Sequence, residues 1–293
     1  MASSNGSRQV HEFRVQVGPA AFRIGSPWRQ PIDRLAQLYR DYPTPNISDF
    51  SVRLEPATPF RRFVRRSVAI GGDYMLPDAV PLPFAQALLA AEMGMNLQMA
   101  LGWRRHLLLH ASAVEKHGRV LVMTGLSGSG KSTLSALLGH HDWRFMGDEF
   151  ALIDLISGAA VPFPRLISLK NEAIGAMQAA VPDGRFGPLM EATPKGDIRH
   201  LVPPGEAISR MGEGGPPALL LFPRFGYPGA VREVAPGETF MRLTQASTNY
   251  VALGEAGFAA MTRFVKSVPS RAIDYQSGEE AITLVEKLWE RLA

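Results

Sequence analysis

A run of glycine, serine and lysine near the middle of the chain has a spacing that could bind phosphate. Residues 125–133 read GLSGSGKST and match the pattern G-x-x-x-x-G-K-[ST]. Glycines in such a loop let backbone N–H groups turn inward around an anion, and the N-terminus of a following helix adds partial positive charge. Lys131 would reach the β- and γ-phosphates of a bound nucleotide, and the Ser132 hydroxyl would ligate Mg²⁺. The residues expected to contact ATP are Gly125, Ser127, Gly128, Ser129, Gly130, Lys131, Ser132 and Thr133.

The segments on either side of this loop have the patterns that a phosphate-binding loop requires. Residues 118–124 (GRVLVMT) form a short aliphatic stretch typical of a buried strand, and residues 134–138 (LSALL) carry apolar residues at helical spacing. A strand–loop–helix context distinguishes a functional loop from a chance match. The alternative, a Gly/Ser-rich turn before a helix, is disfavoured because both flanks fit.

The first acidic pair after the loop is Asp148-Glu149, and Asp148 follows Lys131 by only seventeen residues. In most phosphate-loop NTPases, the acid associated with Mg²⁺ ends a strand many residues further on. The short interval here leaves room for the helix of the loop and one returning strand. That geometry would bring Asp148 back beside the γ-phosphate, within reach of a nucleophile. An ordinary turn residue at a strand end is the alternative for Asp148.

This close pairing resembles the HPr kinase/phosphorylase family and its relatives with a phosphoenolpyruvate-carboxykinase-like nucleotide fold. In that family a G-x-S-G-x-G-K-S loop is followed shortly by a strand ending in Asp-Asp. Residues 108–115 (LLHASAVE) are similar to the family's segment ahead of the loop, in which a histidine lies near the active centre. The segments closest to the subgroup called HprK-related kinase A are residues 164–172, 193–196, 222–224 and 249–258. The likeness covers roughly residues 107–293.

The resemblance implies an α/β fold in which a phosphate-loop domain of the HPr kinase type, a mixed sheet flanked by helices, follows a smaller N-terminal α/β unit. By resemblance, Asp148 would be the general base that takes the proton from a hydroxyl as it attacks the γ-phosphoryl group. Glu149 replaces the second Asp of the usual pair, and would hold Mg²⁺ through water or orient His110. The expected metal contacts are Ser132, Asp148 and Glu172.

Phosphoryl transfer also needs cationic side chains, because negative charge is spread over the transition state. Lys131 supplies one. The other candidates for phosphate or substrate contacts are Arg165, Lys170, Lys195 and Arg224. Structural alternatives remain for several of these residues. His110 could be a satisfied polar group at a strand end. Glu172 and Lys170 could form a solvated helix start, and Lys195 could be a surface lysine in a loop.

Composition narrows the classes of protein to which the chain could belong. The 293 residues suffice for one large domain or two modest ones, and 46% hydrophobic with 20% charged residues is typical of a globular protein. A net charge of +4 does not favour a nucleic-acid partner. The chain has no cysteine, which excludes disulfides, thiol nucleophiles and thiolate metal sites. No apolar stretch is long enough to span a bilayer, and residues 1–7 are polar without a signal core, so we expect a cytoplasmic protein.

The pattern of apolar residues predicts an N-terminal α/β unit over residues 1–100 and a catalytic phosphate-loop domain over residues 101–293. The pattern does not define the role of the N-terminal unit, for which binding of a partner or acceptor is a candidate. In the first unit we expect a strand pair at 12–24 turned at Gly18-Pro19, a helix at 32–39, strands at 50–54 and 60–70, and a helix at 84–101. The basic cluster at 61–66 would be a solvated strand face, with a patch for an acidic partner or phosphate as the alternative.

The second unit is expected to carry its strands close to the loop and its helices at the end of the chain. The predicted strands are 107–115, 118–124, 143–149, 151–154, 162–169 and 218–222, and the predicted helices are 248–264 and 278–292. Residues 181–217 are rich in Gly and Pro and are expected to form long loops.

Together these features predict an ATP- and Mg²⁺-dependent kinase that phosphorylates a hydroxyl of Ser or Thr in a small protein or peptide, or of a small molecule. The HPr phosphocarrier is the less favoured acceptor, since the N-terminal unit and the second acid both depart from that family. One alternative is an ATP-binding sensor or scaffold with little transfer activity, and another is a carboxykinase acting on a metabolite acid. The family likeness also raises the expectation of a homo-oligomer.

Overall fold

The computed structural model describes residues 10–76 and 78–292, and this part of the chain divides into two compact units. The first unit ends at Gly102; the second begins at Trp103 and also includes Val17–Pro19. The polar segment 1–7 lies outside the described residues. Within the described ranges, no helix has the length and apolar character needed to cross a membrane.

The described part of the first unit is built on a five-stranded sheet in the order β1-β2-β3-β4-β5. Its strands are β1 (His11–Val17), β2 (Ala20–Ser26), β3 (Phe50–Pro56), β4 (Ser67–Gly72) and β5 (Leu82–Pro83). Helix α1 (Arg29–Leu38) connects β2 to β3, and this crossover lets the two strands run parallel. Helix α2 (Ala87–Gly102) packs against β3 and β4, and Gly94 permits the close approach, since a Cβ there would lie 2.5 Å from Val52 Cγ1.

The basic cluster of this unit is not a strand face, so the prediction of a strand over residues 60–70 is wrong in its first half. Residues Pro59–Arg62 form a short 3₁₀ turn, and β4 begins only at Ser67. Thr58 caps the turn by accepting from the Arg61 N–H at 3.4 Å, and Pro59 has no N–H to give to a sheet ladder. The strand pair turned at Gly18-Pro19 and the helix in residues 32–39 are confirmed.

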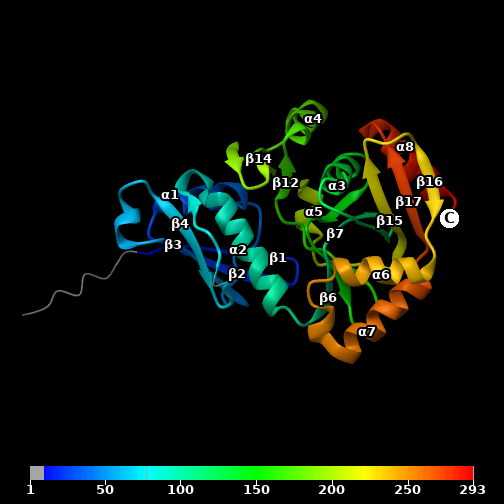
Figure 1. Ribbon diagram of the computed structural model, residues 1–293, viewed down its shortest axis with the longest axis horizontal. Helices are drawn as coiled ribbons and strands as arrows, with labels where there is room; N and C mark the ends of the chain where they lie inside the picture. Colours follow the sequence, from blue (N-terminus) through cyan, green and yellow to red (C-terminus); the bar gives the residue numbers. More distant parts are fainter. Residues whose placement is uncertain (1–9, 77, 293) are drawn as a thin grey trace, which may run out of the picture. The chain divides into compact units, whose positions relative to one another are not determined.

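The described part of the second unit is centred on a six-stranded sheet in the order β16-β17-β15-β8-β7-β9 (Figure 1). Its strands are β7 (Ala111–Lys116), β8 (Arg119–Thr124), β9 (Arg144–Gly147), β15 (Pro217–Phe225), β16 (Ala230–Glu233) and β17 (Ser270–Tyr275). Strands β8, β15 and β17 run parallel, whereas β7 and β16 run antiparallel to their neighbours. The expected mixed sheet flanked by helices is therefore confirmed.

Alternate residues of the central strands point into two hydrophobic cores on opposite faces of the sheet. Leu121 and Met123 of β8 face a core shared with α3 (Lys131–Gly139) and α8 (Gly278–Glu290). Val120 and Val122 face the other core. That core is covered by α6 (Pro236–Ala246), α7 (Tyr250–Ser267) and a small sheet of β6 (His106–Leu109), β10 (Ala151–Asp154) and β11 (Ala160–Val161). The central strands are thus buried on both faces, which explains their almost continuous apolar sequence.

Three predictions for this unit are wrong in whole or in part. Residues 107–115 do not form one strand: β6 pairs with β10 in the small sheet, and after His110 the chain enters the central sheet as β7. Residues 181–217 are not long loops, because they contain β13 (Met190–Thr193), β14 (Gly196–Leu201) and α5 (Gly205–Ser209). The Gly and Pro residues of this region lie between these short elements or at their first residues, so a composition typical of loops concealed the elements. The strand expected from Pro162 begins only at Ile167, as β12 (Ile167–Lys170).

Candidate functional site

Three chain segments meet at one edge of the central sheet because of the direction of its strands. Strand β7 pairs antiparallel with β8, with Ala111 opposite Thr124, and also pairs antiparallel with β9, with Ala113 opposite Gly147. Strands β8 and β9 therefore run in the same direction and end at the same edge, where β7 begins. His110, the loop after β8 and Asp148 all emerge there.

The phosphate-type loop joins β8 to α3 through two glycines in the left-handed region. Gly128 has φ of 82°, and Gly130, the N-cap of α3, has φ of 93°. Side chains at such angles are strained, so these positions favour glycine. A Cβ at Gly130 would also collide with the Tyr275 hydroxyl at 2.2 Å. The loop therefore presents backbone N–H groups at the start of a helix, as anion binding requires.

Lys131, the first residue of α3, turns its side chain back over the loop. Its Nζ donates to the carbonyl oxygens of Gly125 at 2.8 Å and Leu126 at 3.0 Å. The residue is 7% exposed, and burial lowers the pKa of the Lys131 ammonium while the charges of Asp148 and Glu149 oppose that shift. The ammonium thus lies within electrostatic reach of both acidic residues.

Asp148 follows the last residue of β9 and is buried at the sheet edge, with 3% exposure. The Ser112 hydroxyl donates to its Oδ1 at 2.8 Å, whereas its buried Oδ2 has no hydrogen-bond partner among the described residues. Burial, and then the charge of Glu149, raise the pKa of Asp148, whereas the neighbouring Ser112 and Ser132 hydroxyl groups and the Glu149 N–H act to lower it. The structure therefore brings the Asp148 carboxyl group next to the loop, with one oxygen fixed and the other unpaired.

Glu149 adopts a positive φ of 70°, so its side chain leaves the backbone in a different direction from that of Asp148. Its Oε2 lies 3.7 Å from His110 Nδ1. Burial acts to raise the pKa of Glu149, but the nearby positive charges outweigh it and the pKa is lowered overall. The residues that lower it are His110, Lys170, Arg165 and Lys195. Four sequence-predicted residues from separate segments thus surround one carboxylate.

A small three-stranded sheet in the described residues, of order β12-β14-β13, positions the lysine side chains near Glu149. Lys170 ends β12 and pairs with Ile198 of β14. Lys195 is exposed in the turn between β13 and β14, and Arg165 is buried just before β12. Lys195 and Lys170 are therefore brought to the same place by antiparallel pairing rather than by sequence proximity.

Two predicted residues lie apart from this cluster. Glu172 is exposed in the first turn of α4 (Glu172–Ala180), where an acidic side chain favours a helix N-terminus. Arg224 lies near the end of β15, on the side of β8 away from β7 and β9. It makes two hydrogen bonds to Asp274, at 2.9 and 2.6 Å. The geometry thus supports the helix-start interpretation for Glu172 and puts Arg224 on the far side of the loop from Asp148.

Sequence reasoning missed Ser112 as a residue of this site. Ser112 is fully buried and holds the Asp148 carboxyl group. It lies near the start of β7, between the buried Ala111 and Ala113. A hydroxyl side chain between two alanines in this buried part of the strand was the available signal. The sequence contains no comparable signal for Tyr275, which is buried and whose hydroxyl donates to the Ser129 carbonyl of the loop.

The oxygen donors at the edge fit Mg²⁺. A magnesium site commonly uses one or two carboxylates together with substrate phosphates. The Ser132 hydroxyl would supply one such donor from the protein, and the Asp148 carboxyl group lies next to it. Among the described residues, no group of three or more His, Asp or Glu side chains could hold a metal ion by itself. The donor set therefore suits a cation that arrives with a phosphate ligand.

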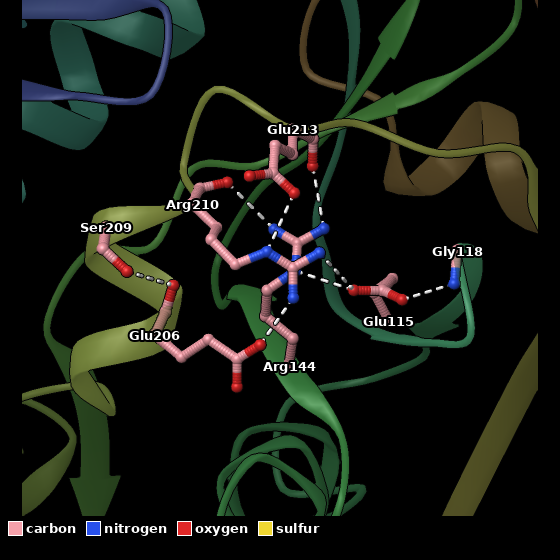
Figure 2. A network of polar contacts seen from close by, with 7 residues as sticks. All are labelled: Glu115, Gly118, Arg144, Glu206, Ser209, Arg210 and Glu213. Atoms are coloured by element: carbon pink, nitrogen blue, oxygen red, sulfur yellow. Dashed lines mark hydrogen bonds and ion pairs between the residues drawn. The ribbon is translucent and has the colours of Figure 1, made fainter.

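A second charged cluster occupies the opposite end of β7 and β9 (Figure 2). Arg144 Nε donates to Glu115 Oε2 at 2.7 Å, and its other nitrogens donate to the backbone carbonyls of Arg210 and Glu213. The second Glu115 oxygen accepts from the Gly118 N–H at 2.6 Å. Each residue drawn in the figure has at least one partner, and the bonds from Arg144 to the Arg210 and Glu213 carbonyls hold the segment after α5 against the sheet.

The fold and the site define a mixed α/β protein with a glycine-rich loop at the edge of its central sheet, between a buried strand and the start of a helix. No protein-family model matches the chain, and no curated protein matches it. Among solved structures, the HPr(Ser) kinase/phosphatase from Coxiella burnetii aligns with 63% of this chain and 94% of that chain, at 13% sequence identity and a TM-score of 0.27. A likeness this weak says nothing about the chemistry of this chain, which must be inferred from its own residues.

Proposed function

We propose that this protein is an ATP- and Mg²⁺-dependent kinase that transfers the γ-phosphoryl group to a hydroxyl, with Asp148 as the general base. The observation that carries the proposal is the unpaired, buried Oδ2 of Asp148 next to Ser132 and Lys131. Burying a carboxylate oxygen without a partner costs stability, and an uncompensated group of this kind beside the loop favours a catalytic role.

The environment of Asp148 suits proton removal. Burial and the Glu149 charge raise its pKa, which increases the proton affinity of the carboxylate toward the range useful for a general base. The Ser112 hydroxyl fixes Oδ1, so that Oδ2 is the oxygen free to accept a proton from an attacking hydroxyl. The same carboxyl group could return the proton if the reaction ran backwards with phosphate.

Cationic side chains would stabilise the charge that develops during transfer. Lys131 would exchange its bonds to the Gly125 and Leu126 carbonyls for bonds to phosphate oxygens. Lys170 and Lys195, now balanced by Glu149, would lie near the incoming acceptor. Mg²⁺, when bound with the nucleotide, would neutralise phosphate charge.

The acceptor in this proposal carries a hydroxyl, either of Ser or Thr in a small protein or peptide, or of a small molecule. The argument for such an acceptor is that Asp148 offers one proton-accepting oxygen at the edge where the loop and β9 end. Of the alternatives, a sensor or scaffold predicts ATP binding without transfer, and a carboxykinase predicts release of carbon dioxide from a metabolite acid.

The proposal is tested by following the labelled γ-phosphate of ATP, with Mg²⁺, into water and into a panel of hydroxyl-bearing peptides and small molecules. Asp148→Asn should retain ATP binding and reduce transfer by about 10²- to 10⁴-fold, the usual contribution of a general base. Lys131→Ala should weaken ATP binding itself. Asp154→Asn, a carboxylate on β10 that is occupied by the Ser157 turn, is the matched control and should transfer at the native rate.

Two results would contradict the proposal. The first is transfer by Asp148→Asn at the native rate. The second is ATP binding by the native protein with no transfer to any acceptor or to water, which would favour the sensor.

A further inference from the structure

Two half-exposed aromatic side chains lie at the end of β15 and just after it, and the first of them adjoins the loop. Phe225 is 49% exposed and Tyr227 is 47% exposed. The Phe225 N–H donates to the Ser129 carbonyl of the loop at 3.3 Å, and a Cβ at Gly130 would lie 3.3 Å from Phe225 Cβ. Large apolar side chains next to an anion-binding loop are thus available to a ligand that occupies the loop.

Each of these two rings packs against a neighbouring side chain. The Arg224 guanidinium lies 3.9 Å from the centroid of the Tyr227 ring, and its two hydrogen bonds to Asp274 fix its orientation. The Phe225 ring lies 5.8 Å from the ring of Tyr275, which is 3% exposed. The rings therefore need little ordering when a ligand binds, which reduces the entropic cost of contact.

The strand order shows on which side of the loop the aromatic side chains lie. Strand β8, which leads into the loop, lies between β7 and β15. Asp148 lies on the β7 and β9 side, so a terminal phosphate beside Asp148 leaves the rest of a nucleotide to extend toward β15. The chain end of β15 carries Phe225, and Tyr227 follows after the turn at Gly226.

We infer that Phe225, Tyr227 and Arg224 form the nucleobase subsite of this protein, an inference that rests on the proposed function. Aromatic rings and guanidinium planes bind bases by stacking, which tolerates different bases because every base has a π-face. Arg224 already donates two of its five N–H groups to Asp274, and we infer that stacking on the two rings, rather than hydrogen bonds to a base edge, dominates in this subsite. The ligand class is therefore a nucleoside triphosphate selected by stacking, and ATP and GTP bind with similar affinity.

The test compares ATP, GTP and inorganic tripolyphosphate as ligands of the full chain in titration calorimetry with Mg²⁺. Tyr227→Ala and Phe225→Ala should each weaken ATP and GTP binding by about 5- to 100-fold, the usual effect of removing a stacking ring, and leave tripolyphosphate binding unchanged. Tyr227→Phe keeps the ring and should bind ATP as the native chain does. Phe258→Ala removes an exposed ring that packs on Phe240 and is the matched control.

The outcomes separate this inference from the proposed function. If ATP and tripolyphosphate both bind and Lys131→Ala weakens both, but the two ring variants keep the native ratio of the two affinities, the subsite is overturned while the phosphate site stands. If the native chain binds neither ligand, the subsite and the proposed function fail together. A strong preference for ATP over GTP would also overturn recognition by stacking. Melting temperatures of all variants verify that they are folded.

Discussion

Strands β7 and β9 carry a buried charged cluster at each end, and the two clusters differ in how well their charges are satisfied. At one end, Glu115 accepts hydrogen bonds from Arg144 and Gly118. At the other, Asp148 keeps a buried oxygen without a partner in the described part of the chain. The same sheet therefore holds one charged cluster that stabilises the fold and one that destabilises it.

The pKa shifts of the two carboxyl groups point in opposite directions for this reason. Burial would raise both. For Glu115 the hydrogen bonds from Arg144 and Gly118 and the charges of Arg144 and Arg210 outweigh burial, and its pKa is lowered. For Asp148 burial and the charge of Glu149 prevail over the serine hydroxyl groups, and its pKa is raised. A buried carboxylate is evidence for function only where its partners fail to compensate its burial.

The largest expected effect comes from breaking the satisfied cluster. Arg144→Met leaves the Glu115 carboxylate buried without its main partner, and removing one member of a buried pair typically costs about 3–5 kcal/mol. At about 2–4 °C per kcal/mol for a domain of this size, the melting temperature should fall by roughly 6–20 °C. Scanning calorimetry measures this change.

The control for that experiment is Glu238→Gln, which breaks the partly exposed pairs with Arg232 and Arg242 and should change the melting temperature by far less than Arg144→Met. A melting temperature for Arg144→Met equal to that of the native chain would show that the cluster of Figure 2 contributes nothing to stability.

A smaller effect of opposite sign is expected at the other end of the strands. Because the pKa of Asp148 is raised in the folded state, its ionised form destabilises the fold above that pKa, and the penalty disappears as the pH falls below the unfolded value. Asp148→Asn removes the charge and should raise the stability at neutral pH by about 1 kcal/mol, or roughly 2–4 °C. The gain should vanish in acid.

Asp154→Asn is the contrasting variant, because hydrogen bonds from Ser157 and Ile156 lower the pKa of Asp154. Its substitution should reduce stability at neutral pH. If Asp148→Asn and Asp154→Asn lowered the stability by the same amount, the result would contradict the difference proposed between an uncompensated and a compensated carboxylate.

The smallest predicted effect is a shift in the pH dependence of transfer. The pKa of Glu149 is lowered, so it stays charged while Asp148 titrates, and its charge raises the pKa of Asp148. In Glu149→Gln this contribution is absent, and the acid limb of the pH–rate profile for kcat/KM should move to lower pH. A limb that stays in place or moves to higher pH would show that Glu149 does not act on the group that controls the rate.

The sequence predicted the loop and the return of Asp148 because both depend on local features. The strand before the loop, the glycines within it and the helix after it are contiguous, and the seventeen residues from Lys131 to Asp148 allow few arrangements. The confirmed helix α8 likewise follows from apolar periodicity, with a Ser277 cap that accepts from the Glu280 N–H. Such signals need no knowledge of distant contacts.

The environment of Glu149 could not be predicted in the same way. Lys170 and Lys195 meet there because β12 pairs with β14, and nothing in the short strands of residues 181–217 identifies that pairing. The break at His110 was hidden for a different reason. Residues on both sides of it are buried, so the sequence LLLHASAV has no change of pattern where the chain passes from one sheet to another.

His110 lies in the short connection between β6 and β7, and Asp148 and Glu149 lie in the matching connection between β9 and β10. This arrangement limits how far the three residues can move relative to one another. Both connections leave the central sheet and join neighbouring strands of the small sheet, where Leu109 pairs with Ala151. Each connection is therefore fixed by the backbone hydrogen bonds of the strands before and after it. The spacing between the histidine and the acids is thus set by the framework before any substrate arrives, and reaching a reactive arrangement would demand little reorganisation.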